Sequence, residues 1–289
     1  MERERSRSLE LARHYLDLGR PEQALDALQR GDIDPEAPEL FQLRACALFD
    51  SGRNSDAATA AREGLARLPE SIDLLETLAL AELQLGHHEE AQRAIDQALK
   101  ISPWNEVLHA QRALILARNG EFTKARTALE EAVRLNPDAT HVLQVRAQVE
   151  VMADSGEADA AIEDLLSVDP ENRVGHILKG DLAASTQNFG VAVRHYGTAA
   201  RLDPSDSGVT EAAREARVGA HPLLAPARAM WRFGRWRSYF LYITLLVLLA
   251  AAGLEPLRIA LIVVWLTIVV LSWFGPPLLR RWQRRRYGG

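Results

Sequence analysis

The sequence predicts an all-α protein: a solenoid of stacked helical hairpins followed by two transmembrane helices. Three observations lead to this fold class. Prolines recur at a nearly constant interval over the first two thirds of the chain, glycines stand at a fixed distance before several of them, and two long apolar runs occupy the C-terminal part. The first two patterns indicate repeated helical hairpins, and the third indicates membrane-spanning segments.

The prolines define the repeat. Successive members are separated by 34, 34, 34, 33 and 34 residues, and they are Pro35, Pro69, Pro103, Pro137, Pro170 and Pro204. Proline cannot donate a hydrogen bond to the preceding helical turn, and it disfavours helical backbone at the residue before it. Each of these prolines is therefore expected to follow the end of a helix.

Glycines and alanines mark the turn inside each hairpin. Gly52, Gly86 and Gly120 stand seventeen residues before a proline, and Gly19 stands sixteen before Pro35. An alanine stands five residues after each of these glycines, and in the sixth repeat an alanine takes the equivalent position: they are Ala24, Ala57, Ala91, Ala125 and Ala192. Such small residues let the two helices of a hairpin approach closely. In the fifth repeat Gly156 lies only fourteen residues before Pro170, which predicts a longer first helix and a shorter second one.

These residues resemble the tetratricopeptide repeat family over about residues 5–204. The third repeat, residues 72–105, fits the family spacing best, at Leu75, Leu78, Ala79, Gly86, Ala91, Ile95, Ala98 and Pro103. The resemblance implies a tetratricopeptide-type α-solenoid of about six repeats over residues 1–204, in which each hairpin relies on its neighbours for a core. Residues 205–220 are expected to close the array as a capping helix with one apolar side.

Two apolar runs follow a basic and aromatic linker at residues 221–238. Residues 239–254 carry no charge, and residues 259–279 form a second uncharged run after the short turn Glu255–Arg258. A buried hairpin in a soluble domain is the alternative, but the chain offers too little globular mass to cover both helices. We therefore expect a transmembrane helical hairpin over residues 239–279 and a basic cytoplasmic tail over residues 280–289.

Charge is divided unevenly between the two parts. Residues 221–289 hold ten Arg and one acid, a formal charge of +9, and residues 1–220 carry −14. By the positive-inside rule both ends of the hairpin, and with them the repeats, face the cytoplasm. The orienting residues are Arg232, Arg235, Arg237, Arg280, Arg281, Arg284, Arg285 and Arg286. Arg supplies 31 of the 34 basic residues, which indicates a GC-rich genome and hence a bacterial inner membrane.

The sequence gives little support for an enzyme. It lacks a glycine-rich phosphate loop, a nucleophile elbow and a kinase motif, and its histidines and lone Cys46 do not show the spacing of a zinc site. We expect no cofactor and no bound metal. The acidic repeats also disfavour nucleic acid, whose binding requires Lys and Arg to neutralise phosphates.

The function expected from the resemblance is binding of a protein partner in a concave groove lined by the first helix of each repeat. The inward positions fall at Gln42, Phe49, Glu76, Leu80, Leu83, Gln111, Leu114, Gln144, Gln148 and Asp181. For each of them, packing between repeats is an equal alternative. The partner would be a cytoplasmic or membrane protein, and the lipid bilayer would hold the chain; oligomerisation stays open. In the alternative function the hairpin associates within the membrane of a larger assembly, which the small residues Ala250–Gly253 favour.

Overall fold

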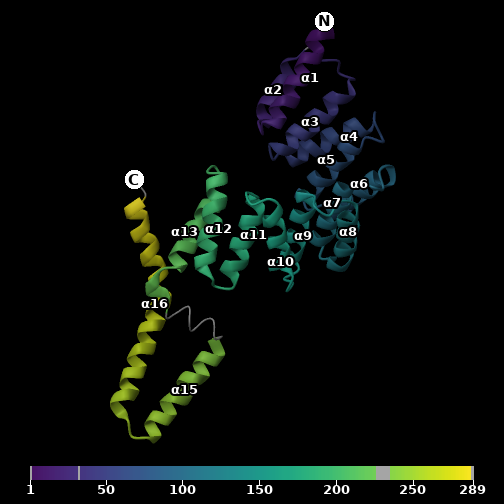
Figure 1. Cartoon of the computed structure of the whole chain (residues 1–289). Coiled ribbons are helices and arrows are strands. Elements are labelled where there is room, and N and C mark those ends of the chain that lie inside the picture. The colour runs from purple at the N-terminus through teal and green to yellow at the C-terminus, as the bar shows by residue number, and fades with distance from the viewer. Residues whose placement is uncertain (1, 32, 226–234, 288–289) are drawn as a thin grey trace. The chain divides into compact units, whose positions relative to one another are not determined.

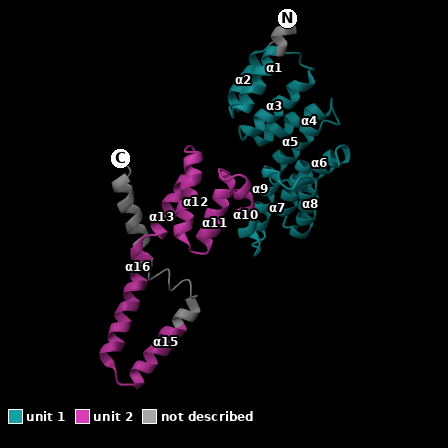
Figure 2. Cartoon of the chain, viewed as in Figure 1, with its two compact units in different colours: residues 1–161 teal, residues 162–289 magenta. Residues whose placement is uncertain are grey.

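The structure, a computed structural model of the whole chain, describes residues 2–31, 33–225 and 235–287. The described residues form fifteen α-helices and one 3-10 helix and contain no strand, so the all-α class is confirmed. The chain divides into two compact units, residues 1–161 (unit 1) and residues 162–289 (unit 2) (Figure 2).

Unit 1 is a series of helical hairpins. Its helices are α1 (Glu2–Asp17), α2 (Pro21–Arg30), α3 (Pro38–Asp50), α4 (Asn54–Leu65), α5 (Ile72–Gln84), α6 (His88–Ile101), α7 (Glu106–Arg118), α8 (Phe122–Leu135), α9 (Thr140–Met152) and the start of α10 (Ala158–Val168). The odd-numbered helices α1, α3, α5 and α7 each pack against the even-numbered helix that follows, as along α3 to α8 in Figure 1. First helices also contact one another across repeats, as α3 contacts α5 and α7 contacts α9.

The turns inside the hairpins share one geometry. The second residue after the end of the first helix has a positive φ, which is 80° at both Gly86 and Gly120. The backbone N–H of Gly86 donates to the carbonyl oxygen of Leu83 at 3.1 Å, and that of His87 donates to Glu82 at 2.9 Å, so the last carbonyls of α5 are satisfied. Glycine adopts this backbone without a Cβ clash, which explains its fixed place in the first four hairpins.

The fifth hairpin turns at Asp154 and not at Gly156. Asp154 has a φ of 48°, and its N–H donates to the carbonyl oxygen of Val151. Helix α9 has 13 residues, as do α5 and α7, so the prediction of a longer first helix was wrong. Helix α10 has 11 residues against 14 in α8, so the prediction of a shorter second helix is confirmed.

The small residues lie where the two helices of a hairpin cross. All five of the alanines expected there are fully buried: Ala24, Ala57, Ala91, Ala125 and Ala192. In the fifth hairpin the corresponding residue is Ala158, twelve residues before Pro170 and 2 % exposed. Larger buried side chains such as Leu74, Ile95 and Leu108 fill the space between successive hairpins.

Unit 2 contains the sixth hairpin and the C-terminal helices. They are α11 (Arg173–Ser185), α12 (Phe189–Leu202), α13 (Ser207–Gly219), η1 (Pro222–Leu224), α15 (Arg235–Ala251) and α16 (Glu255–Tyr287), after the end of α10. Helix α13 occupies the segment for which a capping helix is expected. It packs Ala213 and Ala216 against Tyr196 of α12 and leaves Glu211 and Arg214 exposed.

Helices α15 and α16 form a hairpin in which the rings of Tyr242 and Trp265 stack at 4.7 Å. The turn is residues 252–254, with Gly253 at a φ of 69°. The expected turn Glu255–Arg258 is instead the first turn of α16, where the two side chains form an ion pair at 2.7 Å. In the described part of the chain, no helix combines the length and the apolar content needed to cross a membrane.

The arginines expected to orient the hairpin lie outside the described side chains. Arg232 lies outside the described residues altogether. Helices α15 and α16 contain the other seven, whose side chains are not described: Arg235, Arg237, Arg280, Arg281, Arg284, Arg285 and Arg286. Helix α16 runs on to Tyr287, so most of the expected tail is helical.

Gly120→Ala is expected to lower the free energy of unfolding by about 1 kcal/mol, because an L side chain is strained at a positive φ. No atom lies within 4 Å of the position that a Cβ would take there, so the loss reports the backbone alone. Gly156→Ala is the matched control, since it is equally open but has no positive φ. Denaturant titration of both variants measures the difference, and an equal effect at the two sites would contradict the assignment of the turn.

Candidate functional site

The positions expected to line the groove lie on the first helices of the repeats. Unit 1 holds nine of them: Gln42 and Phe49 on α3, Glu76, Leu80 and Leu83 on α5, Gln111 and Leu114 on α7, and Gln144 and Gln148 on α9. Asp181 lies on α11 in unit 2, where it accepts a hydrogen bond from the hydroxyl of Tyr196. The candidate groove is therefore a surface of unit 1, formed by α3, α5, α7 and α9.

Burial separates these side chains into two groups. Most are half-buried, so each packs on a neighbour and still presents one side to solvent: Gln42, Phe49, Glu76, Leu80, Leu114, Gln144 and Gln148. Leu83 is only 5 % exposed and belongs to the core between the third and fourth hairpins, beside Leu75 and Ala94. Gln111 is 6 % exposed. Leu83 therefore has little surface to offer a partner.

Two amide side chains link neighbouring repeats along this face. The Nε2 of Gln42 donates to the hydroxyl of Ser71 at 3.1 Å. The Nε2 of Gln111 donates to the Oε1 of Glu76, while the Oε1 of Gln111 is buried and has no hydrogen-bond partner among the described residues. Among the described residues of the groove, the Oε1 of Gln111 is thus a buried acceptor without a donor.

Cys46 lies on α3, four residues after Gln42, and its side chain is half-buried. Its Sγ donates to Asp50 at 3.8 Å. Burial is the main cause that raises the pKa of this thiol to about 11, and the carboxylates of Asp50, Glu76 and Asp73 raise it further. The thiol therefore stays protonated at neutral pH, which argues against a role as a nucleophile.

Two buried carboxylates that the sequence reasoning missed hold successive repeats together. Glu82 and Glu150 are 1 % and 4 % exposed, and each stands four residues before the turn residue of its hairpin. Glu82 pairs with Arg62 of α4 and with the Nδ1 of His87. The second and fourth repeats place Leu48 and Leu116 here, and the first and sixth place Tyr15 and Ala183, so a glutamate at a position otherwise held by uncharged residues was the available signal.

The corresponding contacts of Glu150 come from α8 and from the turn. Its Oε2 lies 2.8 Å from the Nη2 of Arg126, and the hydroxyl of Ser155 donates to the same oxygen. The hydrogen bond from Arg126 is the main cause that holds the pKa of Glu150 below its usual value. Such pairing compensates for burying the charge, so Glu150 has a structural role.

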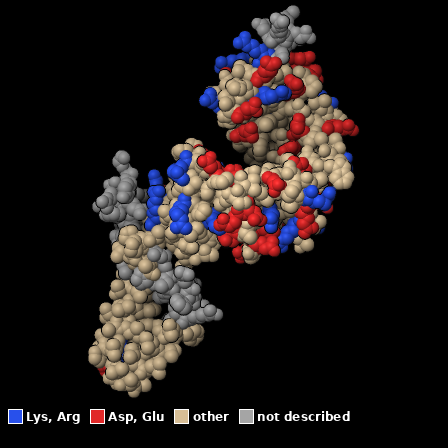
Figure 3. All heavy atoms as spheres, viewed as in Figure 1, with Lys and Arg blue, Asp and Glu red and all other residues tan. Residues whose placement is uncertain are grey.

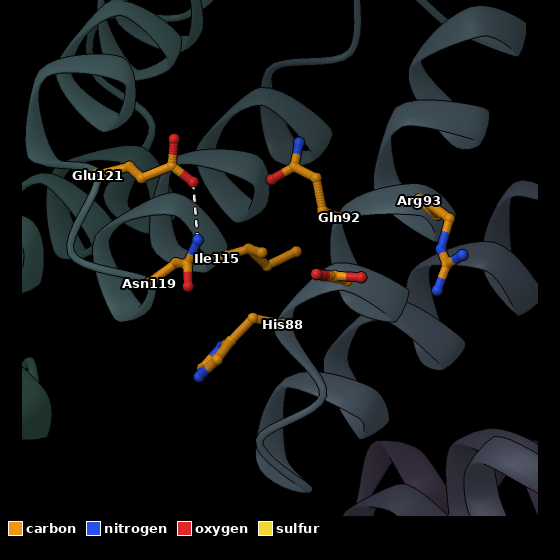
Figure 4. A pocket seen from close by; sticks show the side chains of 7 residues that line it. His88, Gln92, Arg93, Ile115, Asn119 and Glu121 are labelled. Atoms are coloured by element: carbon orange, nitrogen blue, oxygen red, sulfur yellow. Dashed lines mark hydrogen bonds between the residues drawn. The ribbon is translucent and has the colours of Figure 1, made fainter.

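A small pocket lies beside the turn between α7 and α8 (Figure 4). His88, Gln92 and Arg93 of α6 line one side, and Ile115, Asn119 and Glu121 line the other. The Nδ2 of Asn119 donates to Glu121 at 2.7 Å, and the side chains of His88 and Arg93 point away from each other. Within the described residues no three His, Cys, Asp or Glu side chains lie close enough to hold a metal ion. The pocket therefore has no evident chemistry of its own.

Comparison with known proteins identifies the repeats. Family models described as tetratricopeptide repeat match residues 43–105 and 83–149. The hairpins of this region are tetratricopeptide repeats. A comparison with curated proteins found no match.

Solved structures with the same fold extend over most of the chain. A thermophilic tetratricopeptide repeat protein from Thermus thermophilus is 20 % identical, with a TM-score of 0.57, and the match covers 63 % of this chain and 100 % of that one. Pseudomonas aeruginosa pilF is 19 % identical, with a TM-score of 0.52, and the match covers 73 % of this chain and 96 % of that one. These likenesses confirm the solenoid fold. Tetratricopeptide repeats generally act as scaffolds for protein partners, so the fold suits interaction better than catalysis.

Proposed function

We propose that the chain is a membrane-anchored adaptor whose tetratricopeptide groove binds a cytoplasmic protein segment. The observation that carries the proposal is the uncovered apolar surface of the α15–α16 hairpin. Leu241 is 71 % exposed, Val247 63 % and Ile259 58 %. Figure 3 shows the hairpin almost without charged side chains over its described part. Exposure of so much apolar surface to water is unfavourable. A lipid bilayer is an environment that would cover two adjacent apolar helices.

The flanking sequence supports this placement. Arginines precede the first apolar run and follow the second, while the connecting region holds only the Glu255–Arg258 pair. This asymmetry favours a bacterial inner membrane with the repeats and the C-terminus in the cytoplasm. The hairpin would then be a two-span anchor with the 252–254 turn on the far side.

The groove supplies the binding surface in this proposal. Phe49, Leu80 and Leu114 offer half-buried apolar surface on three successive first helices, and Gln144 and Gln148 add amide groups on the fourth. A helix or an extended peptide can use such a surface, because its side chains pack on the apolar positions and its polar groups pair with the amides. Asp181 remains a candidate contact on unit 2.

The alternative is that the hairpin itself joins a larger intramembrane assembly. Its support is the small-residue stretch Ala250–Gly253, because small residues allow close helix packing in lipid. These residues lie in the last turn of α15 and in the turn that follows, where they bend the chain. A role in the turn accounts for them, and we keep the adaptor as the proposal.

Leu248→Lys combined with Val270→Lys is expected to reduce the membrane-bound fraction severalfold, because each central charge in a span costs about 2.5–3.5 kcal/mol. Both side chains are more than half exposed on the hairpin. Leu223→Lys is the control, since Leu223 is 57 % exposed on η1 outside the hairpin. Alkaline extraction of native membranes measures the fraction for the full chain.

Two results would contradict the anchor. One is release of the wild-type chain by alkaline extraction, and the other is labelling of a reporter after Gly289 from outside the cell. Exchanging residues 235–287 for a foreign two-span anchor then separates the two functions. The adaptor keeps its partner after the exchange, whereas an intramembrane subunit loses it.

A further inference from the structure

Two histidines face each other inside the sixth hairpin. His176 lies on α11 and His195 on α12, and both side chains are half-buried. Their Nδ1 atoms are 3.0 Å apart, and their ring centroids are 5.2 Å apart. A hydrogen bond at this distance needs a proton on one nitrogen and a lone pair on the other. The two helices pack side by side (Figure 1), so the pair links α11 to α12.

A backbone carbonyl decides which of the two histidines holds that proton. The Nε2 of His176 lies 3.0 Å from the carbonyl oxygen of Pro170, and a carbonyl can only accept a hydrogen bond. Neutral His176 therefore carries its proton on Nε2 and leaves its Nδ1 as an acceptor. The donor to this Nδ1 is then the Nδ1–H of His195, whose own Nε2 carries no proton.

The bonded pair can take up one further proton but not two. A first proton on the Nε2 of His195 leaves the bond between the Nδ1 atoms in place. A second proton would go to the Nδ1 of His176, and two N–H groups would then face each other at 3.0 Å. The hydrogen bond is lost in that state, and the two positive charges repel. In the unfolded chain, by contrast, each histidine takes up a proton independently at about pH 6.5.

The groups around His195 add to this effect. Burial is the main cause that holds the pKa of His195 below its usual value, followed by its partner His176. The positive charges of Lys179 on α11 and Arg194 on α12 lower it further, and Glu163 of α10 opposes them. Glu163 is already paired with Lys179, which is only 9 % exposed. Among the described residues, the charged side chains of α13, the other helix packed on α12, contribute nothing to the shift.

A metal ion is the other species that two imidazoles can bind. It would have to replace the proton that bonds the two Nδ1 atoms. Within the described residues, no group of three His, Cys, Asp or Glu side chains could complete its coordination. The proton is therefore the ligand that the pair accommodates.

We propose that the His176–His195 pair is an acid-sensitive clamp, which holds the sixth hairpin closed at neutral pH and releases it in mild acid. Below about pH 6.5 the folded pair binds fewer protons than the unfolded chain, so the stability that it contributes is complete above this pH and is lost as the pH falls. Helix α11 carries Asp181, so acid would loosen the part of the candidate groove that lies on unit 2. The inference does not depend on the proposed adaptor function.

Hydrogen exchange of the full chain in detergent, followed by mass spectrometry, tests the clamp. Exchange is compared at about pH 7.5 and about pH 5.5, on the two sides of the ordinary titration of histidine, with labelling times scaled to the intrinsic rates and EDTA in every buffer. We expect the amides of α11 and α12 to exchange about tenfold faster at the lower pH, because the open hairpin binds one proton more than the closed one. The internal control is the α3–α4 hairpin, which contains no histidine and should change less than twofold.

A substitution at His195 identifies the group that titrates. An asparagine amide there can still donate to the Nδ1 of His176, or turn its oxygen toward it, and it has no charge to gain. His195→Asn is therefore expected to abolish the acid effect on α11 and α12. The control His14→Asn changes an exposed histidine of α1 and is expected to retain it.

Two results would overturn the clamp. One is equal acid sensitivity of the α11–α12 and α3–α4 hairpins in the wild type, which decides the matter even if the variant folds poorly. The other is an acid effect that persists in a folded His195→Asn variant, because a different group would then be titrating. Neither result bears on the groove or on the membrane anchor.

Discussion

Replacing Leu80 and Leu114 together by glutamate is expected to reduce partner capture at least a hundredfold, a loss of roughly 3 kcal/mol of binding free energy. Both leucines are half-buried on successive first helices, α5 and α7. Two carboxylates there would have to be desolvated against the apolar part of the partner, which is costly when no cation pairs with them. Crosslinking in native membranes, followed by quantification of every captured protein, measures the change.

The control for this variant changes two leucines that lie outside the groove. Leu18→Glu combined with Leu85→Glu adds the same charge at exposed positions next to the hairpin turns after α1 and α5. We expect this control to capture the partner as the wild type does, and circular dichroism should show both variants to be equally helical. If the folded groove variant captures every partner undiminished, the groove is not the binding site. The convex face of the repeats must then be considered.

The repeat was predictable from sequence because one backbone requirement recurs in every hairpin. The turn needs a residue at positive φ, and Gly52, Gly86 and Gly120 supply it at a constant distance from the next proline. The rule failed where another residue takes this backbone. Asp154 and Gln187 have φ values of 48° and 60°, so the turns of the fifth and sixth hairpins carry no glycine at this position.

The groove was only partly predictable, because helical periodicity shows on which side of a helix a residue lies but not how deeply its side chain is buried. Leu80 and Leu83 are three residues apart on α5 and share an inward direction, yet Leu80 is half-buried and Leu83 is in the core. The difference depends on how closely the next hairpin packs, which no single repeat encodes.

The C-terminal hairpin shows a similar limit. The charged pair Glu255 and Arg258 suggested a turn, but both residues are compatible with the first turn of a helix. Gly253 can adopt a positive φ at no steric cost, and the chain turns there. The position of a glycine was therefore better evidence for the turn than the position of the charges.

Ala158→Leu is expected to lower the free energy of unfolding by about 2–3 kcal/mol, because extra methylene groups at a closely packed helix crossing force the helices apart. Ala158 lies at the start of α10 and is 2 % exposed. Its counterparts in the third and fourth hairpins, Ala91 and Ala125, are fully buried. Ala160→Leu makes the same change two residues later at an exposed position, and it should alter the stability by less than about 0.5 kcal/mol. Denaturant titration of the two variants, monitored by helical circular dichroism, compares them directly. Equal effects of the two substitutions would show that the helices of the fifth hairpin do not cross at Ala158.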